Sequence, residues 1–121
     1  MNQLFDELTE RYEVHSDMVG FGTEVRQVGL AYKKNRDDHY LVKLNTLPGI
    51  RFYVRRDSRG ERGWIIFTGM VKTQTANRFF NPVGQAERIS SQYLKLKFQD
   101  LDLICYIRLS PKDYHYTASV A

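Results

Sequence analysis

The chain has 121 residues, of which 42% are hydrophobic and 13% aromatic, so it can bury the core of a single domain and is not a disordered tail. Its formal net charge of +4 at pH 7 permits a nucleic acid, an anionic membrane surface or an acidic protein as partner and selects none of them. One cysteine excludes an intramolecular disulfide, and no stretch approaches the roughly 20 apolar residues of a membrane-spanning helix. The first residues lack the pattern of a signal peptide, so we expect a cytoplasmic protein.

A short N-terminal helix is predicted over residues 2–13. Its apolar residues share one stripe of a 3.6-residue period: Leu4, Phe5, Leu8 and Tyr12. Acidic residues fill the remaining positions, which suits the positive end of a helix dipole. Such a helix would cover the core or mediate dimerisation, and its acidity makes it a poor candidate for contact with nucleic acid.

From residue 24 onward the chain is predicted to form mostly antiparallel sheet, which gives an α+β fold in a single domain, 1–121. Apolar and polar residues alternate over short runs, as is typical of half-buried strands, and turn residues separate the runs. The predicted strands span residues 24–32, 39–45, 50–55, 64–68 and 70–75, three β-rich runs within 83–109 that include 93–99 and 103–109, and residues 114–120.

Three features between residues 69 and 82 affect this assignment. Gly69 is expected to break the preceding strand, and Asn81-Pro82 is expected to mark a turn. Phe79 and Phe80 cannot both face inward on a regular strand. Either one of them is exposed, for a base or a partner, or the segment is a loop tucked into the core, which is the interpretation favoured here.

Residues 48–67 form the most informative stretch, a predicted β-hairpin. Alternation places Phe52 on a core-like face together with Ile50 and Val54, and it places Tyr53 on the opposite face between two arginines. A basic loop follows. An aromatic flanked by guanidinium groups is suited to stacking a base and holding phosphates, although exposed strands also carry Arg and Tyr without binding anything. The candidate nucleic-acid-binding residues are Arg51, Tyr53, Arg55, Arg56, Arg59 and Arg62, with Lys95 and Lys97 on a similar later strand.

An internal repeat is predicted, with units 24–68 and 79–121. Val28-Gly29-Leu30-Ala31 and Val83-Gly84-Gln85-Ala86 share the pattern V-G-x-A, and each is followed by a Tyr-Leu run and then by an Arg-bearing strand. Alternation common to all β meanders accounts for part of this similarity. A genuine duplication would present two related binding faces side by side.

Residues 29–34, GLAYKK, followed by residues 40–44, YLVKL, resemble a family of small proteins of unknown function encoded on proteobacterial conjugative plasmids and integrative elements. The pattern of that family is G-A-A-W-K-K followed by Y-L-S-V-K-L-D, and Tyr32 stands where the family has Trp. The resemblance implies a mobile-element setting and no defined activity.

The residue pattern favours a binding protein over an enzyme. The three histidines have no metal-ligand spacing, so we expect no metal and no cofactor. Gly20-Phe21-Gly22 lacks the Lys-Ser/Thr of a phosphate loop. Asp37-Asp38 with His39 is the one cluster that a metal-dependent enzyme would use, although charge balance on a solvated turn also explains it. Cys105 is expected to be a buried, unreactive thiol.

Single-stranded DNA or RNA is therefore the first predicted partner. The alternative is a mobile-element protein that inhibits or recruits an acidic host protein through the same basic face. No membrane contact is expected, and an oligomer is compatible with the sequence.

Overall fold

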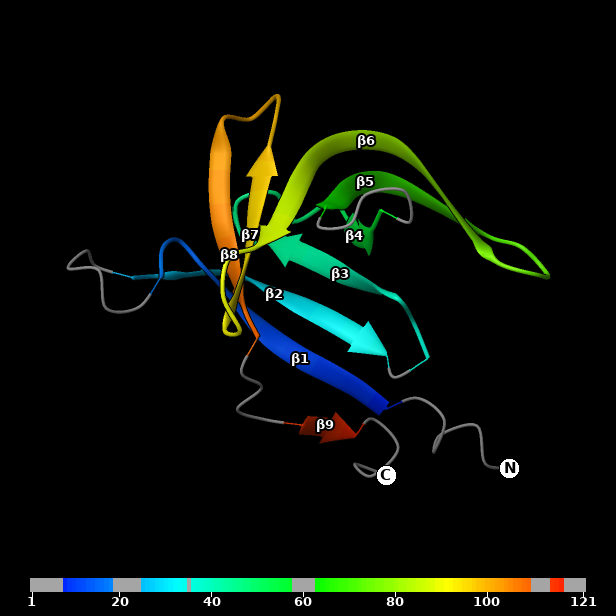
Figure 1. Cartoon of the computed structure of the whole chain (residues 1–121), viewed down its shortest axis with the longest axis horizontal. Helices are drawn as coiled ribbons and strands as arrows, with labels where there is room; N and C mark the ends of the chain where they lie inside the picture. The colour runs from blue at the N-terminus through cyan, green and yellow to red at the C-terminus, as the bar shows by residue number, and fades with distance from the viewer. Residues whose placement is uncertain (1–7, 19–24, 35, 58–62, 110–113, 117–121) are drawn as a thin grey trace.

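The computed structural model describes residues 8–18, 25–34, 36–57, 63–109 and 114–116. Within these ranges all regular structure is β-strand, so the predicted α+β class is wrong and the fold is all-β. The described residues also contain no helix long and apolar enough to cross a membrane. The strands of Figure 1 are β1 (Leu8–His15), β2 (Gln27–Lys34), β3 (His39–Leu44), β4 (Phe52–Arg56), β5 (Gly63–Lys72), β6 (Asn77–Arg88), β7 (Tyr93–Phe98), β8 (Leu103–Arg108) and β9 (Tyr114–Tyr116).

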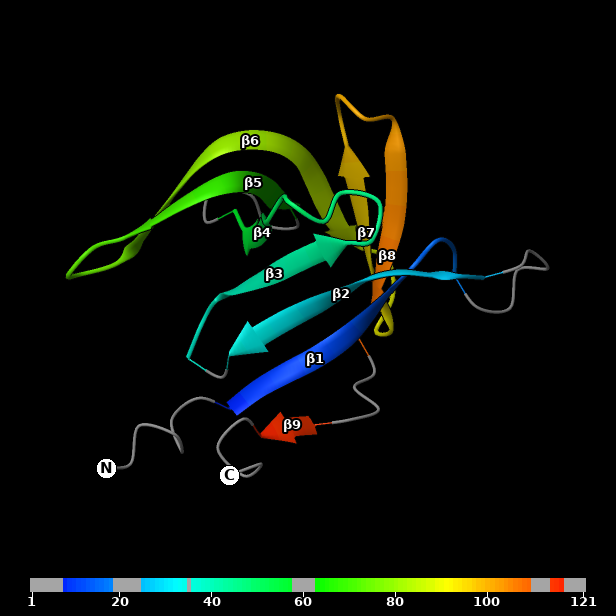
Figure 2. The ribbon, with the colours of Figure 1, turned by 180° about the vertical axis from the view of Figure 1, so that it is seen from behind.

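Strands β1 to β8 form a closed antiparallel barrel in which each strand pairs with its neighbours in the sequence. The ring closes because β1 pairs with β2 on one side and with β8 on the other, through Val14 with Ile107 and His15 with Tyr106. Strand β9 pairs with Leu8–Glu10 at the start of β1, whereas β8 pairs with Val14 and His15 at the end of β1. Figure 2 shows β1 and β9 at the lower side of the barrel as seen from behind.

The predicted N-terminal helix is contradicted from Leu8 onward, since residues 8–13 lie in β1; residues 1–7 lie outside the described part of the chain. Tyr12 and Val14 point into the barrel, where both are buried. Strand pairing explains the outcome: β1 has seven Cα partners along β2, whereas a lone short helix would gain little from its one apolar stripe.

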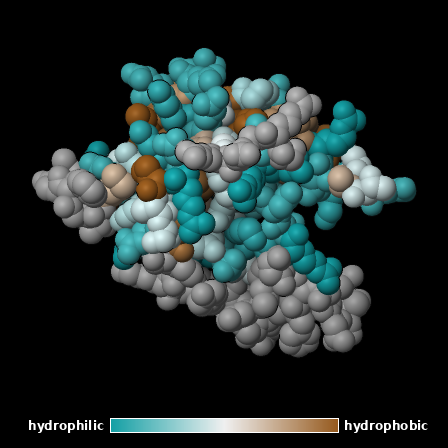
Figure 3. Space-filling view, in the orientation of Figure 1, coloured by the Kyte–Doolittle hydropathy of each residue, from teal (hydrophilic) through white to brown (hydrophobic). Residues whose placement is uncertain are grey.

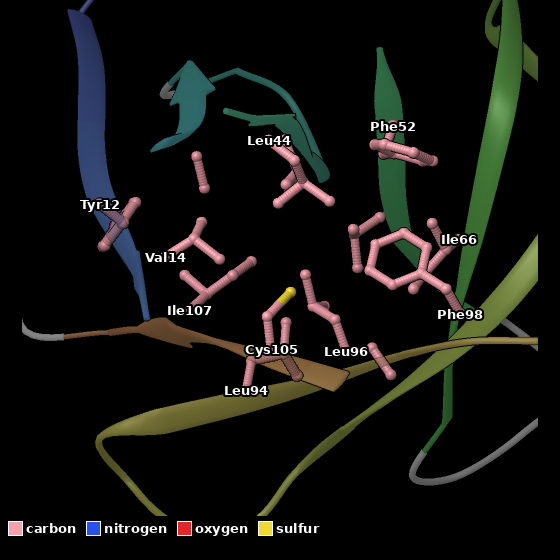
Figure 4. Close-up of a cluster of buried hydrophobic side chains, with 14 residues drawn as sticks. Tyr12, Val14, Leu44, Phe52, Ile66, Leu94, Leu96, Phe98, Cys105 and Ile107 are labelled. Carbon is pink, nitrogen blue, oxygen red and sulfur yellow. The ribbon is translucent and has the colours of Figure 1, made fainter. Parts of the chain in front are cut away.

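The core fills the barrel with side chains that alternate along each strand, as Figure 4 shows. Phe52 and Phe98 meet edge to face from opposite walls, with ring centroids 4.8 Å apart. The predicted inward face of β4 is confirmed for Phe52 and Val54, whereas Ile50 precedes the strand and is exposed. Cys105 is buried as predicted, inside the same core.

A long hairpin of β5 and β6 extends beyond the barrel. Only Trp64–Phe67 of β5 pair with β4, and only Gly84–Arg88 of β6 pair with β7, so residues 68–83 have no strand partner outside the β5–β6 hairpin. We call these residues the ribbon; Figure 1 shows it arching past β4 to a tip that projects beyond the other strands. Gly69 and Asn81-Pro82 therefore do not end strands as predicted, and the turn lies between Lys72 and Asn77.

Two glycines occupy matching positions in the two halves of the barrel. Gly29 faces the backbone of Lys43 and Leu44, and Gly84 faces the backbone of Lys97 and Phe98. In each case the β-carbon of any other residue would overlap the lysine carbonyl oxygen. These positions need glycine because two backbones approach closely there.

The residue before each glycine forms a bulge. Val14 pairs with Gly29 and His15 with Gln27, which leaves Val28 as an extra residue, and the pairing around Val83 in β6 follows the same pattern. Both bulges lie in the V-G-x-A segments on which the predicted repeat rests. The repeat itself, with units 24–68 and 79–121, stays a prediction, because the second unit extends into residues outside the described part.

Candidate functional site: a basic, aromatic groove on the barrel wall

Three rows of side chains cross the outer face of β2, β3 and β4. Their order follows from the register of the two strand pairs, because residues opposite one another across antiparallel strands point to the same face. Along the strands the rows are Lys43 with Arg51, Tyr32 with Leu41 and Tyr53, and Lys34 with His39 and Arg55.

A groove of about 360 Å³ lies on this face. Strands β2, β3 and β4 form its floor, and Met70 of the ribbon and Thr9 of β1 contribute to its walls. Its volume falls in the range of pockets that hold small ligands. The groove is lined by Thr9, Tyr32, Lys34, Asp37, His39, Leu41, Lys43, Arg51, Tyr53 and Met70.

The groove carries an excess of positive charge. Lys34, Lys43 and Arg51 are exposed cations, and Asp37 is the carboxylate among its lining residues. No carboxylate in the described part of the chain forms an ion pair with any of the three cations. Among the described residues the groove thus carries three cations and one carboxylate, an excess of positive charge that favours an anionic ligand.

An aromatic cluster anchors the ribbon to the barrel beside the groove. The Phe79 ring lies 5.1 Å from His39, 5.6 Å from Phe67 and 6.2 Å from Tyr53, measured between ring centroids. The guanidinium carbon of Arg55 lies 5.1 Å from the centroid of the same ring. Phe79 is thus packed against the barrel wall, whereas its neighbour Phe80 covers Gly69 and is 46% exposed.

Arg55 is already engaged by the protein. Its Nε donates a hydrogen bond to Oδ2 of Asp38 at 3.3 Å, in addition to its contact with Phe79. Burial alone would raise the pKa of the Asp38 carboxyl. The hydrogen bond from Arg55 and its positive charge together lower that pKa by more than burial raises it, so the pKa lies below its ordinary value. Arg55 therefore braces the β3–β4 hairpin and the ribbon.

His39 is buried beneath the groove between two carboxylates. Its Nε2 lies 3.9 Å from Oδ2 of Asp37, and its Nδ1 lies 3.6 Å from Oδ1 of Asp38. The described residues contain no cluster of three or more His, Cys, Asp or Glu that could hold a metal ion. In this arrangement both carboxylates face the His39 imidazole, and Asp38 also pairs with the Arg55 guanidinium.

The structure divides the predicted site residues. Arg51 and Tyr53 line the groove, whereas Arg55 contacts Asp38 and Phe79. Arg56 ends β4 on the inward-facing side, so it lies off the groove face. Two further predicted residues lie outside the described part of the chain: Arg59 and Arg62.

Lys95 and Lys97 lie in a different groove, of about 440 Å³, on the outer face of β5, β6 and β7. Three strand pairings separate Lys97 from Arg55. This second groove also contains Asp57 and Glu87, and Glu87 lies directly opposite Lys95 in the sheet. Its charges balance, so the second groove is a weaker site for a polyanion.

The sequence prediction missed the residues that complete the first groove: Tyr32, Lys34, Lys43 and Met70. Alternation over residues 39–45 already placed Lys43 and Leu41 on one face. The missing information was that β2 and β3 lie beside β4 and that the ribbon folds back toward them. Alternation within a run shows which residues share one face of a strand, but it does not show which other strands lie beside that strand.

The face in Figure 3 is mostly hydrophilic, with hydrophobic residues in small separate patches. Burial raises the pKa of the Cys105 thiol to about 12, so a reactive thiolate is not available. No protein-family model, curated protein or solved structure matches this chain.

Proposed function

We propose that this protein binds single-stranded nucleic acid in the groove on the outer face of β2, β3 and β4. The observation that carries the proposal is the combination of three cations that have no ion-pair partner among the described residues with two tyrosines in one groove. The cations are Lys34, Lys43 and Arg51, and the tyrosines are Tyr32 and Tyr53. The role is one of binding, not of catalysis.

The physical chemistry of a single strand fits these groups. Lysine and arginine neutralise phosphates and release the counterions condensed on them, which makes binding strong at low salt and weak at high salt. An aromatic ring stacks on an unpaired base whatever its identity. A duplex hides its base faces, so the tyrosines favour an unpaired strand.

The test measures the affinity of fluorescent oligothymidine and oligouridine strands over a series of salt concentrations. If the three groove cations each neutralise one phosphate, the plot of log K against log salt has a slope of about −2, since each contact contributes about −0.7. Lys43→Ala and Arg51→Ala each flatten that slope by about 0.7. Lys97→Ala, in the charge-balanced second groove, is the matched control and leaves both affinity and slope unchanged.

Stacking is tested separately with Tyr53→Leu, which keeps apolar contact with the aromatic cluster and removes the stacking ring. We expect a loss of about 1–3 kcal/mol with the salt slope unchanged, because stacking releases no counterions. A melting experiment on each variant verifies that the barrel is intact. Wild-type protein that ignores all strands at about 50 mM salt would show that the nucleic-acid proposal is wrong.

The alternative partner is an acidic protein of the host, in keeping with the mobile-element resemblance. Val71 and Phe80 favour it, because they lie exposed on the ribbon at 51% and 46%, beside the exposed Arg78. In that case Phe80→Ser removes the interaction with a captured partner, while oligonucleotides do not bind at any salt concentration.

A further inference from the structure

The groove has a chemical order from one end to the other. Lys43 and Arg51 occupy the first row, Tyr32, Leu41 and Tyr53 the second, and Lys34, His39 and Arg55 the third, beyond which the β2–β3 turn carries Asp37. Successive rows on one face are two residues apart, which is about 7 Å along a strand. The groove therefore runs from a cationic end, across an aromatic middle, to a third row about 14 Å away, where the turn that joins Lys34 to His39 adds the Asp37 carboxylate.

A nucleotide has the same order of chemistry. Its phosphate is anionic, its base has an aromatic face, and its outer edge carries hydrogen-bond donors and acceptors. With the phosphate near Lys43 and Arg51 and the base against Tyr53, the edge of the base points toward Asp37. The row spacing leaves room for a sugar and a base between the two charged ends.

Asp37 is the unexpected member of this groove, because a carboxylate repels phosphate. Its side chain is 31% exposed, and Oδ2 lies 3.9 Å from His39 Nε2, beyond hydrogen-bond distance. Its backbone N–H donates to the carbonyl of Lys34 at 3.0 Å, which fixes the turn that carries it. The backbone of Asp37 is thus fixed at the end of the groove, and its part-exposed carboxylate has the capacity to accept hydrogen bonds.

An ionised carboxylate accepts hydrogen bonds and donates none, so it selects for adjacent donors. Guanine alone among the common bases presents two neighbouring donors, N1–H and the N2 amino group, on its Watson–Crick edge. Adenine and cytosine place a ring acceptor beside their amino group, and thymine and uracil flank one N–H with two carbonyls. A carboxylate meets guanine with two bonds and repels the acceptors of the other bases.

From this arrangement we infer that the groove is selective for guanine in a single strand, with Asp37 as the specificity-determining residue. The inference rests on the proposed function, since it assigns the base that the same groove reads. The phosphate contacts provide affinity and the carboxylate provides the choice of base.

The test compares short oligothymidine strands that carry a central guanine, a central inosine or no substitution, in the DNA series and in the matching RNA series. Wild-type protein is expected to prefer the guanine strand over the unsubstituted strand by about tenfold, within the range for a bidentate base contact. Inosine keeps N1–H and lacks the amino group, so it should lose most of that preference.

Asp37→Asn should abolish the guanine preference without flattening the salt slope, since no cation is removed. Glu87→Gln, a carboxylate of the second groove, is the matched control and should keep the preference. Equal affinity of wild-type protein for all strands, or a preference that survives Asp37→Asn or is lost in Glu87→Gln, would overturn the inference while the proposed function stands. Failure of every strand to bind would refute the proposed function, and the inference with it.

Discussion

Replacing Gly84 with alanine tests one of the two close backbone approaches in the barrel. The added methyl group would overlap the carbonyl oxygen of Lys97 and would come within 3.1 Å of the Phe98 Cα and 3.2 Å of an Ile66 methyl group. The first two obstacles are backbone atoms, so β6 and β7 would have to separate. Overpacking of this kind costs about 1–3 kcal/mol, and the entropy advantage of alanine over glycine returns about 0.4–1 kcal/mol.

We therefore expect Gly84→Ala to lower the free energy of unfolding by about 1–2 kcal/mol. For a domain of this size the melting temperature falls by about 4–8 °C. Thermal unfolding followed by circular dichroism measures it. Gly63→Ala is the matched control, because Gly63 has open space around its β-carbon position, and it should melt at or slightly above the wild-type temperature. Equal melting of Gly84→Ala and wild type would refute the close backbone approach.

Two other predictions concern side chains outside the groove floor. Cys105, whose pKa is raised to about 12 by burial, should react with a thiol reagent only after denaturation, and labelling of the native protein would contradict its place in the core. Asp38 has a lowered folded-state pKa, so its contribution to stability is present above the unfolded pKa of about 3.9 and is lost as pH falls through the folded value. Asp38→Asn should therefore lower the free energy of unfolding by less than about 1 kcal/mol at neutral pH, because the ion pair with Arg55 is exposed. This difference in the free energy of unfolding between variant and wild type should shrink in acid. A difference that stays unchanged at low pH would contradict the ion pair with Arg55.

Period-2 alternation predicted the strands whose inner faces are uniformly apolar. Phe52 and Val54 in β4 were assigned to the inner face correctly, because every second residue there is hydrophobic. The same signal is masked in β1. Glu10 takes an inward position in β1, near Tyr40 and Arg88, so the run did not alternate cleanly and the i, i+4 stripe of Leu8 and Tyr12 suggested a helix.

Long-range pairing was beyond the reach of the sequence pattern. Gly69 was expected to end a strand, yet it continues one, because the ring of Phe80 on the partner strand covers it. The groove combines β2, β3, β4 and the ribbon, and its composition follows from how the sheet curls. Arg51 and Tyr53 were identified because they lie in the run with the clearest alternation. Lys43 is a candidate only because β3 lies beside β4, which brings Lys43 next to them.

The junction that closes the barrel joins strands that are far apart in the sequence, unlike the other junctions of the ring. Val14 with Ile107 and His15 with Tyr106 are the pairs that join β1 to β8, and they bring together opposite ends of the described chain. Every other neighbouring pair in the ring joins consecutive strands, which can form as hairpins soon after collapse. Because its loop-closure entropy is the largest in the ring, we expect this seam, which has two registered pairs, to form late in folding. An opening between β1 and β8 would leave the pairings of β2 with β3 and of β3 with β4 in place, so the groove floor can persist when the ring is open.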